Sequence, residues 1–501
     1  MHSDGVDYIT QSTTLSSTMA IPTSTSSSPE GTHLVVFIHG LWGKPIHLDH
    51  LRSTLASTHG NRNLHLLLPK SNADYNTYDG IEVGAERITD EIESTIHNLS
   101  SSSSSARVTK ISIVGYSLGG LIARYVVGLL YQNGIFDTIT PINFTTFATP
   151  HLGVRTPSLG YRSRIWNTIG ARTLSTSGQQ MFLIDDFRGS GKCLLTLLAE
   201  PGSVFMRGLA RFEKRSLYAN TQNDRSVPFY TAGISRTDPF VDLEKVDLHY
   251  LPFAEGKEEE EDDRVVLDPE NPVTLRASRD TPPRTTLSTL GLALPSKATR
   301  ESLPFFALFF TLVPIFVPFF LANSVLQTYR SAQRVRLHEA EGSWRRFRIP
   351  VLEDAKERVV ERVMEGSGEE QYLPTPPPER ANESEQVFSS SSSCSKLGSE
   401  MEGKSNGTSQ TSLSSTPAAQ LDPHALSRLE SAKESSPFPI LALTQEQFEM
   451  IDHLDALGFE KFPVHIRKHR HTHAAIVVRT AKEGFGEGRA TVRHWARGFV
   501  V

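Results

Sequence analysis

Short apolar runs alternate with amphipathic stretches in the first half of the chain. The apolar runs, at residues 33–40, 63–69, 110–115, 142–148 and 215–220, predict strands. Helical patterns lie between the earlier strands, at residues 48–58, 81–99 and 118–131. Because strands and helices that alternate in this way form parallel sheets covered on both faces, we predict a mostly parallel α/β core over residues 31–254. The pattern loosens around residues 153–212, where we expect a helical cap.

The rest of the chain is organised differently. Residues 1–30 predict a disordered tail, residues 255–300 an acidic and polar linker, and residues 366–437 a Ser/Pro-rich disordered insertion. Between the last two, we expect a hydrophobic segment with a basic helix at 301–340 and a short helical region at 341–365. Order returns over 438–501, with a helix near 445–457 and a final strand in the sequence FPVHIR.

Composition narrows the function and the cellular location. The 51 Lys and Arg residues against 56 Asp and Glu give a net charge of -5, which leaves no overall basic surface for a nucleic acid. The two cysteines, Cys193 and Cys394, exclude a disulfide framework and favour a reducing, cytosol-facing location. Residues 1–30 contain no apolar stretch of signal-peptide length.

The sequence Gly115-Tyr116-Ser117-Leu118-Gly119 is the strongest chemical motif. It follows a predicted strand and opens a predicted helix, the setting in which a sharp turn exposes a nucleophilic serine. We therefore expect Ser117 to be the nucleophile, the alternative being a small serine that only fills a tight turn.

A second motif, His39-Gly40-Leu41-Trp42-Gly43, follows the first predicted strand. A loop in this place donates one backbone N–H to the oxyanion hole of an α/β-hydrolase, and the residue after the nucleophile donates the other. The expected donors are the amides of Leu41 and Leu118. We interpret His39 as a histidine that packs this loop rather than as the base.

The acid and the base should follow the nucleophile in the chain. Asp224 lies on a turn after an apolar run and is the expected acid. Weaker alternatives are Asp238 and Asp242, with Asp185 and Asp186 in the expected cap. For the base we expect His473, which precedes the sequence AAIVVR, with His494 as the first alternative. The other histidines that qualify by order are His465, His469 and His471.

The histidine cluster HRHTH also raises the possibility of a metal site, but no acidic or cysteine partner accompanies it. We expect neither a metal nor an organic cofactor. The segments VFIHGLWG, GYSLGGLIARY, ATPHLG, NDRSVP and HAAIVVR resemble the fungal serine esterase/lipase family of the α/β-hydrolase superfamily, including its lipid-droplet phospholipase branch. The resemblance covers residues 31–254 and about the last fifty. It implies an α/β-hydrolase fold and supports Ser117, Asp224 and His473 as the catalytic triad, although a long insertion separates the last two.

Residues 303–322 carry no charge, and a straight helix of this length would span about 30 Å, enough to cross a bilayer core. A single crossing would place Asp224 and His473 on opposite sides of the membrane. Because three prolines interrupt the segment, we favour a bent hairpin or an in-plane insertion, with Arg330, Arg334 and Arg336 among lipid headgroups. The residues expected to insert are Phe309, Phe310, Pro314, Phe316 and Pro318.

These features together predict a serine hydrolase that cleaves acyl esters of glycerolipids, with phospholipids as the favoured substrate. The expected location is a lipid droplet or the cytosolic face of the endoplasmic reticulum membrane. Two enzyme alternatives, a neutral-lipid lipase and an acyltransferase, remain open because acyl-pocket residues carry no motif. A third alternative is an inactive hydrolase fold that acts as a membrane-tethered scaffold.

Overall fold

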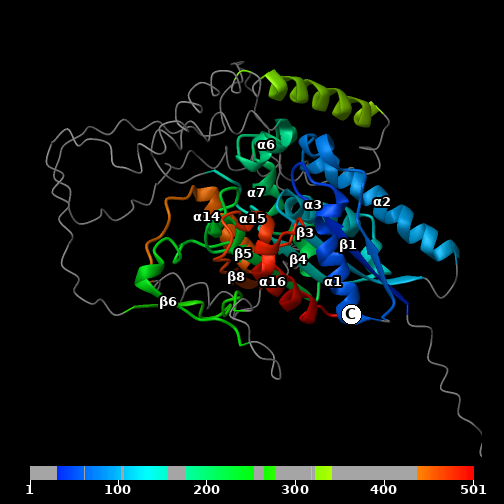
Figure 1. Ribbon diagram of the computed structural model, residues 1–501. Helices are drawn as coiled ribbons and strands as arrows, with labels where there is room; N and C mark the ends of the chain where they lie inside the picture. Colours follow the sequence, from blue (N-terminus) through cyan, green and yellow to red (C-terminus); the bar gives the residue numbers. More distant parts are fainter. Residues whose placement is uncertain are drawn as a thin grey trace, which may run out of the picture. The chain divides into compact units, whose positions relative to one another are not determined.

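The computed structural model describes residues 31–60, 62–102, 107–155, 175–252, 264–276, 318, 322–340 and 437–501. Its main feature is one six-stranded sheet in the order β2-β1-β3-β4-β5-β8, in which every neighbouring pair is parallel (Figure 1). The strands are β1 (Thr32–Ile38), β2 (Leu64–Leu67), β3 (Val108–Tyr116), β4 (Thr140–Phe147), β5 (Lys214–Asn220) and β8 (Glu460–Val464). The predicted parallel sheet is confirmed.

Helices cover both faces of this sheet, as the alternation of side chains along β1 shows. Leu34, Val36 and Ile38 join the core cluster that contains α2 (Ile81–Ser102) and α3 (Leu118–Gln132). Val35 and Phe37 join the opposite cluster, with side chains of the helices α1 (Asp49–His59) and α16 (Gly486–Arg497). Successive side chains of a strand point to opposite faces, so a strand buried on both sides must be apolar throughout.

Much of the expected cap packs as ordinary core. Its described helices are α6 (Ser175–Met181), α7 (Leu194–Leu198) and α8 (Val204–Ala210), while residues 156–174 lie outside the described residues. In α7 and α8, Leu194, Leu198 and Leu209 are fully buried, and Phe205 packs so close to α3 that a Cβ on Gly128 would lie 2.3 Å from its ring. The described part of this region therefore belongs largely to the core.

The described part of the expected linker differs from the prediction, because residues 264–276 belong to the folded unit. Val265 and Leu267 are completely buried, and Val266 forms an antiparallel bridge to Val464 of β8. In addition, β7 (Val273–Leu275) pairs with β6 (Val246–Leu248) in an antiparallel arrangement. Three consecutive apolar residues cover the edge of the sheet that β8 would otherwise expose.

The C-terminal region begins with α14 (Gln445–Asp455), as predicted, and Thr444 and Gln447 form a capping box at its start. After β8 come α15 (Thr472–Ala475) and α16, two helices that the sequence did not predict. The remaining short elements are η1 (Pro45–Leu48), η2 (Asp74–Tyr78), η4 (Ile135–Asp137), η6 (Phe187–Gly189), α9 (Phe229–Ala232), η7 (Leu243–Lys245) and η9 (Glu483–Phe485).

Residues 322–340 form a helix, which Figure 1 shows in yellow-green. Most of the hydrophobic segment before it lies outside the described residues, including Phe309, Phe310, Pro314 and Phe316; Pro318 is described and exposed. The tail at 1–30, the region 341–365 and the insertion up to residue 436 are outside them too. Within the described ranges, no helix has both the length and the apolar character that a membrane crossing requires.

Candidate active site

Three of the residues singled out in the sequence meet at one edge of the sheet. Ser117 directly follows β3, Asp224 follows β5 by four residues and His473 follows β8. Because the strands are parallel, their C-terminal ends lie at the same edge, where open α/β sheets bind their ligands. Asp224 and His473 are 249 positions apart in the chain, and the pairing of β5 with β8 brings them together.

The side chains of these residues form a continuous chain of contacts. Ser117 Oγ lies 2.9 Å from His473 Nε2, and His473 Nδ1 lies 2.8 Å from Asp224 Oδ2. The Asp224 side chain is 2% exposed and that of His473 is 18% exposed, so the acid is enclosed while the imidazole retains access from solvent. This is the geometry of a nucleophile, a base and a group that orients the base.

The backbone at Ser117 is strained in a way that presents its hydroxyl. Its φ of 56° and ψ of -130° are unusual for a residue with a side chain, and such conformations concentrate at functional sites. Gly119 makes the turn possible, because a Cβ there would lie 2.1 Å from the backbone oxygen of Ile38. The glycine thus allows α3 to begin directly against the end of β1.

Asp224 is held by four hydrogen bonds. Besides His473, Asn220 Nδ2 donates to Oδ2 at 2.8 Å, and the amides of Ser226 and Val227 donate to Oδ1 at 3.0 and 2.9 Å. Burial alone would raise the pKa of this carboxyl, but the charge on His473 and these hydrogen bonds outweigh burial and leave the pKa below its ordinary value. Asp224 is therefore a carboxylate that can stabilise an imidazolium.

The backbone of His473 is fixed by two residues that the sequence reasoning missed. Tyr116 donates its buried hydroxyl to the backbone carbonyl of His473 at 2.8 Å, and Thr472 donates to the carbonyl of Gln222 at 2.8 Å. The first contact ties α15 to the turn at Ser117 and the second ties it to the turn at Asp224. Tyr116 occupies the variable position of the GxSxG motif, so its spacing gave no signal of this role.

The loop after β1 passes directly over the nucleophile. A Cβ on Gly40 would lie 2.7 Å from Ser117 Cβ, so only glycine allows this approach. Leu41 follows Gly40, and Leu118 is the first residue of α3, whose amide has no partner within the helix. Their roles as oxyanion donors stay a prediction, although both amides belong to residues adjacent to this contact.

Trp42 extends this loop toward η2. Its φ is 53°, its amide donates to Thr77 Oγ1 at 3.1 Å, and its indole Nε1 donates to the Tyr78 hydroxyl at 2.8 Å. The Trp42 amide is therefore already engaged. The loop over Ser117 is anchored through this side chain to the residues at the end of η2.

The alternative histidines have other partners. His39 is buried with Nδ1 3.2 Å from the carbonyl of Gly40, and burial lowers its pKa, which suits the packing role expected for it. His494 contacts the Tyr218 hydroxyl, and burial is the main cause that lowers its pKa to about 4. His465 contacts Tyr250, while the His469 ring packs on Phe485 and its Nδ1 accepts from the His471 amide.

The alternative carboxylates accept hydrogen bonds from backbone amides. Asp185 accepts from the Leu194 amide and Asp186 from that of Gly191. Asp238 and Asp242 accept from amides two residues further along the chain. In the described part of the chain, no group of three or more His, Cys, Asp or Glu side chains is arranged to hold a metal ion.

The parallel sheet, the strand–turn–helix around Ser117 and the chain order Ser, Asp, His are those of the α/β-hydrolase fold. The family model described as "Putative serine esterase (DUF676)" matches residues 28–237. The chain is 39% identical over 129 residues to "Putative lipase ROG1" of Saccharomyces cerevisiae, covering 25% of this chain and 18% of that protein. It is 35% identical over 137 residues to "Putative lipase C4A8.10" of Schizosaccharomyces pombe, covering 26% and 17%.

Among solved structures, phospholipase PlaB from Legionella pneumophila, in complex with thio-NAD, is similar over 40% of this chain and 41% of its own. The sequence identity is 17% and the TM-score is 0.25. The matched region of the present chain spans less than a fifth of the length of the two yeast relatives.

Proposed function

Because residues 28–237 match the model of a putative serine esterase family, we propose that the protein hydrolyses acyl esters of glycerolipids, foremost phospholipids. The observation that carries the proposal is the unbroken line of contacts from Ser117 Oγ through His473 to Asp224. A scaffold without catalysis would have no need of a strained serine backbone, an enclosed carboxylate and a histidine aligned between them.

The reaction proceeds in two steps. Ser117 Oγ attacks the ester carbonyl while His473 Nε2 takes its proton, and the amides of Leu41 and Leu118 donate to the oxyanion. His473 then returns the proton to the leaving alcohol as the carbonyl–oxygen bond breaks, which leaves an acyl-serine. Water repeats the sequence, releases the fatty acid and restores Ser117. Asp224 holds the imidazole in the tautomer with Nε2 free to accept.

A lipid substrate is supported by two independent points. The yeast relatives are named as lipases, and residues 303–322 form an uncharged run that suits a lipid phase. We place the enzyme on a lipid droplet or on the cytosolic face of the endoplasmic reticulum membrane, where such a run finds an apolar environment. Triacylglycerol is the second candidate substrate, because the lipase names favour it.

The test is fatty-acid release by the full chain from phosphatidylcholine vesicles and, separately, from a triacylglycerol emulsion. Ser117→Ala and His473→Ala should each lower the rate by about 10⁴-fold or more. Ser101→Ala, which changes an exposed serine of α2, is the matched control and should keep full activity. A fluorophosphonate probe should label the wild type and not Ser117→Ala.

The outcomes separate the alternatives. Release from triacylglycerol alone would replace the phospholipase proposal with a lipase. Activity that survives His473→Ala would remove His473 as the base. A wild-type chain that neither releases fatty acid nor reacts with the probe would contradict the enzyme proposal.

A further inference from the structure

The helix at residues 322–340 directs its polar side toward the protein. Its inward side chains recur every three or four residues, which places them on one face of a helix. The members of this inward face are Ser324, Gln327, Ser331, Arg334 and His338. Three of them are almost completely buried, although none is apolar: Ser324 is 7% exposed, Gln327 3% and Ser331 0%. Polar contacts therefore hold this helix in place.

The centre of the attachment is Asp79, whose side chain is fully buried at the end of η2. Arg334 donates to both of its oxygens, with Nη2 at 2.7 Å from Oδ1 and Nε at 2.9 Å from Oδ2. Ser331 donates to Oδ1 at 2.7 Å, and Arg87 Nη1 of α2 lies 2.9 Å from Oδ2. Bidentate pairs between Arg and a carboxylate fix the orientation of the two side chains as well as their position.

A second attachment lies one helical turn further along. His338 Nε2 is 2.6 Å from Glu86 Oε2, and the Glu86 side chain is only 3% exposed. With Asp79 and Glu86 both engaged, the helix is held along two turns and cannot rotate without breaking buried polar contacts. Its outward face is thereby determined.

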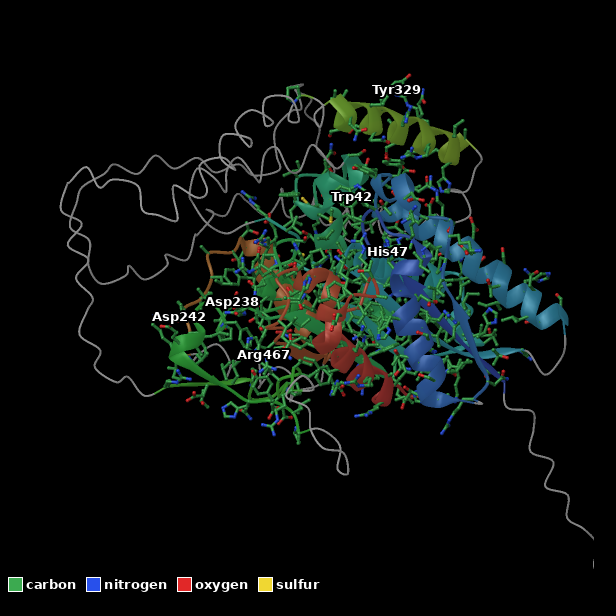
Figure 2. The ribbon with its side chains drawn as sticks, viewed as in Figure 1. Trp42, His47, Asp238, Asp242, Tyr329 and Arg467 are labelled. Atoms are coloured by element: carbon green, nitrogen blue, oxygen red, sulfur yellow. The ribbon has the colours of Figure 1, made fainter. Side chains whose placement is uncertain are left out.

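The exposed side of the helix carries apolar and basic side chains, together with Gln333 and Glu339. Val325, Leu326, Tyr329 and Leu337 are 70%, 44%, 63% and 65% exposed, and Figure 2 shows Tyr329 on the side of the helix turned away from the core. A surface helix of a globular protein normally buries its apolar side and exposes its polar side. Here the polarity is reversed, so the exposed side chains are not explained by packing within the described chain.

Two arginines belong to this outward face. Arg330 and Arg336 are both exposed and lie beside the apolar residues, whereas Arg334 is turned inward to Asp79. The expectation that all three arginines reach lipid headgroups is therefore wrong for Arg334, because its guanidinium is bound to the buried carboxylate of Asp79. The remaining pair still provides two cations next to a stripe of apolar side chains.

We infer that the outward face of the 322–340 helix binds an anionic phospholipid surface and lies in its plane. An apolar stripe accompanied by Arg is the composition of an interfacial helix, in which the stripe enters the acyl boundary and the cations meet lipid phosphates. The chain also enters this helix directly from the uncharged run at 303–322, so the two apolar features are continuous in sequence. A protein partner would explain the stripe but not this continuity.

The attachment links that surface to the active site. Asp79 follows Thr77 and Tyr78, the two residues that anchor Trp42 in the loop over Ser117. The same short segment therefore holds both the helix and the loop next to the nucleophile. The link between helix and active site rests on the proposed function, because it means that the helix orients the active site toward a lipid substrate.

The test uses the full chain with Ser117→Ala, so that vesicles are not consumed and the result does not depend on activity. With Cys193 and Cys394 replaced by serine, an environment-sensitive fluorophore is attached at Tyr329→Cys or, as the control, at Val241→Cys, which is 77% exposed elsewhere. Vesicles of phosphatidylcholine with phosphatidylserine should shift the emission at 329 to the blue and leave 241 unchanged.

A second measurement tests the charges. In the same background, replacing Arg330 and Arg336 together by glutamine should weaken the response at 329 to anionic vesicles by about 30-fold. Arg334 is kept in this variant, because its side chain faces Asp79 and not the vesicle. Pure phosphatidylcholine vesicles should show no difference between the double variant and its parent.

Three results would overturn the inference. One is an emission at 329 that stays water-like on bound vesicles. Another is an equal shift at 329 and 241. The third is a shift at 329 that appears without vesicles and grows with protein concentration, which would identify a second copy of the chain as the partner. Failure of the hydrolase proposal alone would leave the fluorescence result intact.

Discussion

Replacing Asp224 by asparagine tests the chemistry of the site at its most enclosed point. The oxygen of asparagine can still accept from the amides of Ser226 and Val227, as Asp224 Oδ1 does now. Its NH₂ group then faces both Asn220 Nδ2 and His473 Nδ1, where the wild-type carboxylate accepts from each at 2.8 Å. The Asn220 amide can turn so that its Oδ1, which has no partner among the described residues, accepts from this NH₂ group, whereas His473 would be forced to accept at Nδ1 and carry its proton on Nε2.

In that tautomer His473 cannot take the proton of Ser117, so we expect kcat to fall by about 10⁴-fold, equivalent to about 5 kcal/mol of lost transition-state stabilisation. The amides of Ser226 and Val227 would then donate to a neutral oxygen instead of a carboxylate, which should also lower the free energy of unfolding by about 1–3 kcal/mol. Hydrolysis of a soluble short-chain ester gives the first value, and urea unfolding at pH 7 gives the second.

The pH dependence has a definite sign. The folded-state pKa of Asp224 is below its ordinary value of 3.8, so its ionisation contributes stability that is fully present above that value. The contribution is lost as pH falls through the depressed pKa, and the asparagine variant should lack it. Asp242→Asn, at an exposed carboxylate that accepts from the Glu244 amide and forms an ion pair with Lys245 at 3.0 Å, is the control for the enzymatic rate. An Asp224→Asn enzyme within tenfold of the wild-type rate would refute this account of the base.

Two further substitutions test the turn and the helix. Gly119→Ala places a Cβ 2.1 Å from a backbone oxygen of β1 and should cost about 3 kcal/mol in urea unfolding, whereas Gly498→Ala, whose nearest neighbour is 3.5 Å away, should cost less than about 0.5 kcal/mol; equal costs would contradict the steric argument. Arg334→Ala leaves the buried Asp79 with less compensation, so amide hydrogen exchange over 322–340 should speed up by about 30-fold. Arg336→Ala should leave that exchange unchanged, and a similar increase in both would show that the attachment to Asp79 does not hold the helix.

Short-range patterns in the sequence were sufficient for the parallel sheet and for the turn at Ser117. Both are signalled by patterns within a few residues: apolar runs of strand length, helical spacing in α2 and α3, and the glycines on either side of Ser117. The order of Ser117, Asp224 and the later histidines along the chain also narrowed the candidates for the site. It left several histidines open.

Only the tertiary structure decided which histidine lies beside Ser117. The choice depends on β8 pairing with β5 across an interval of more than two hundred residues, and on Tyr116 and Thr472 fixing α15, contacts that no local spacing encodes. The burial of Val265–Leu267 likewise follows from the open edge of β8. The orientation of Arg334 was also decided by the tertiary structure. The helix of Arg334 has an apolar face and a polar face, and the sequence of the helix alone does not say which one packs against the protein. The buried carboxylate of Asp79, 255 positions earlier, binds Arg334 and so turns the polar face inward.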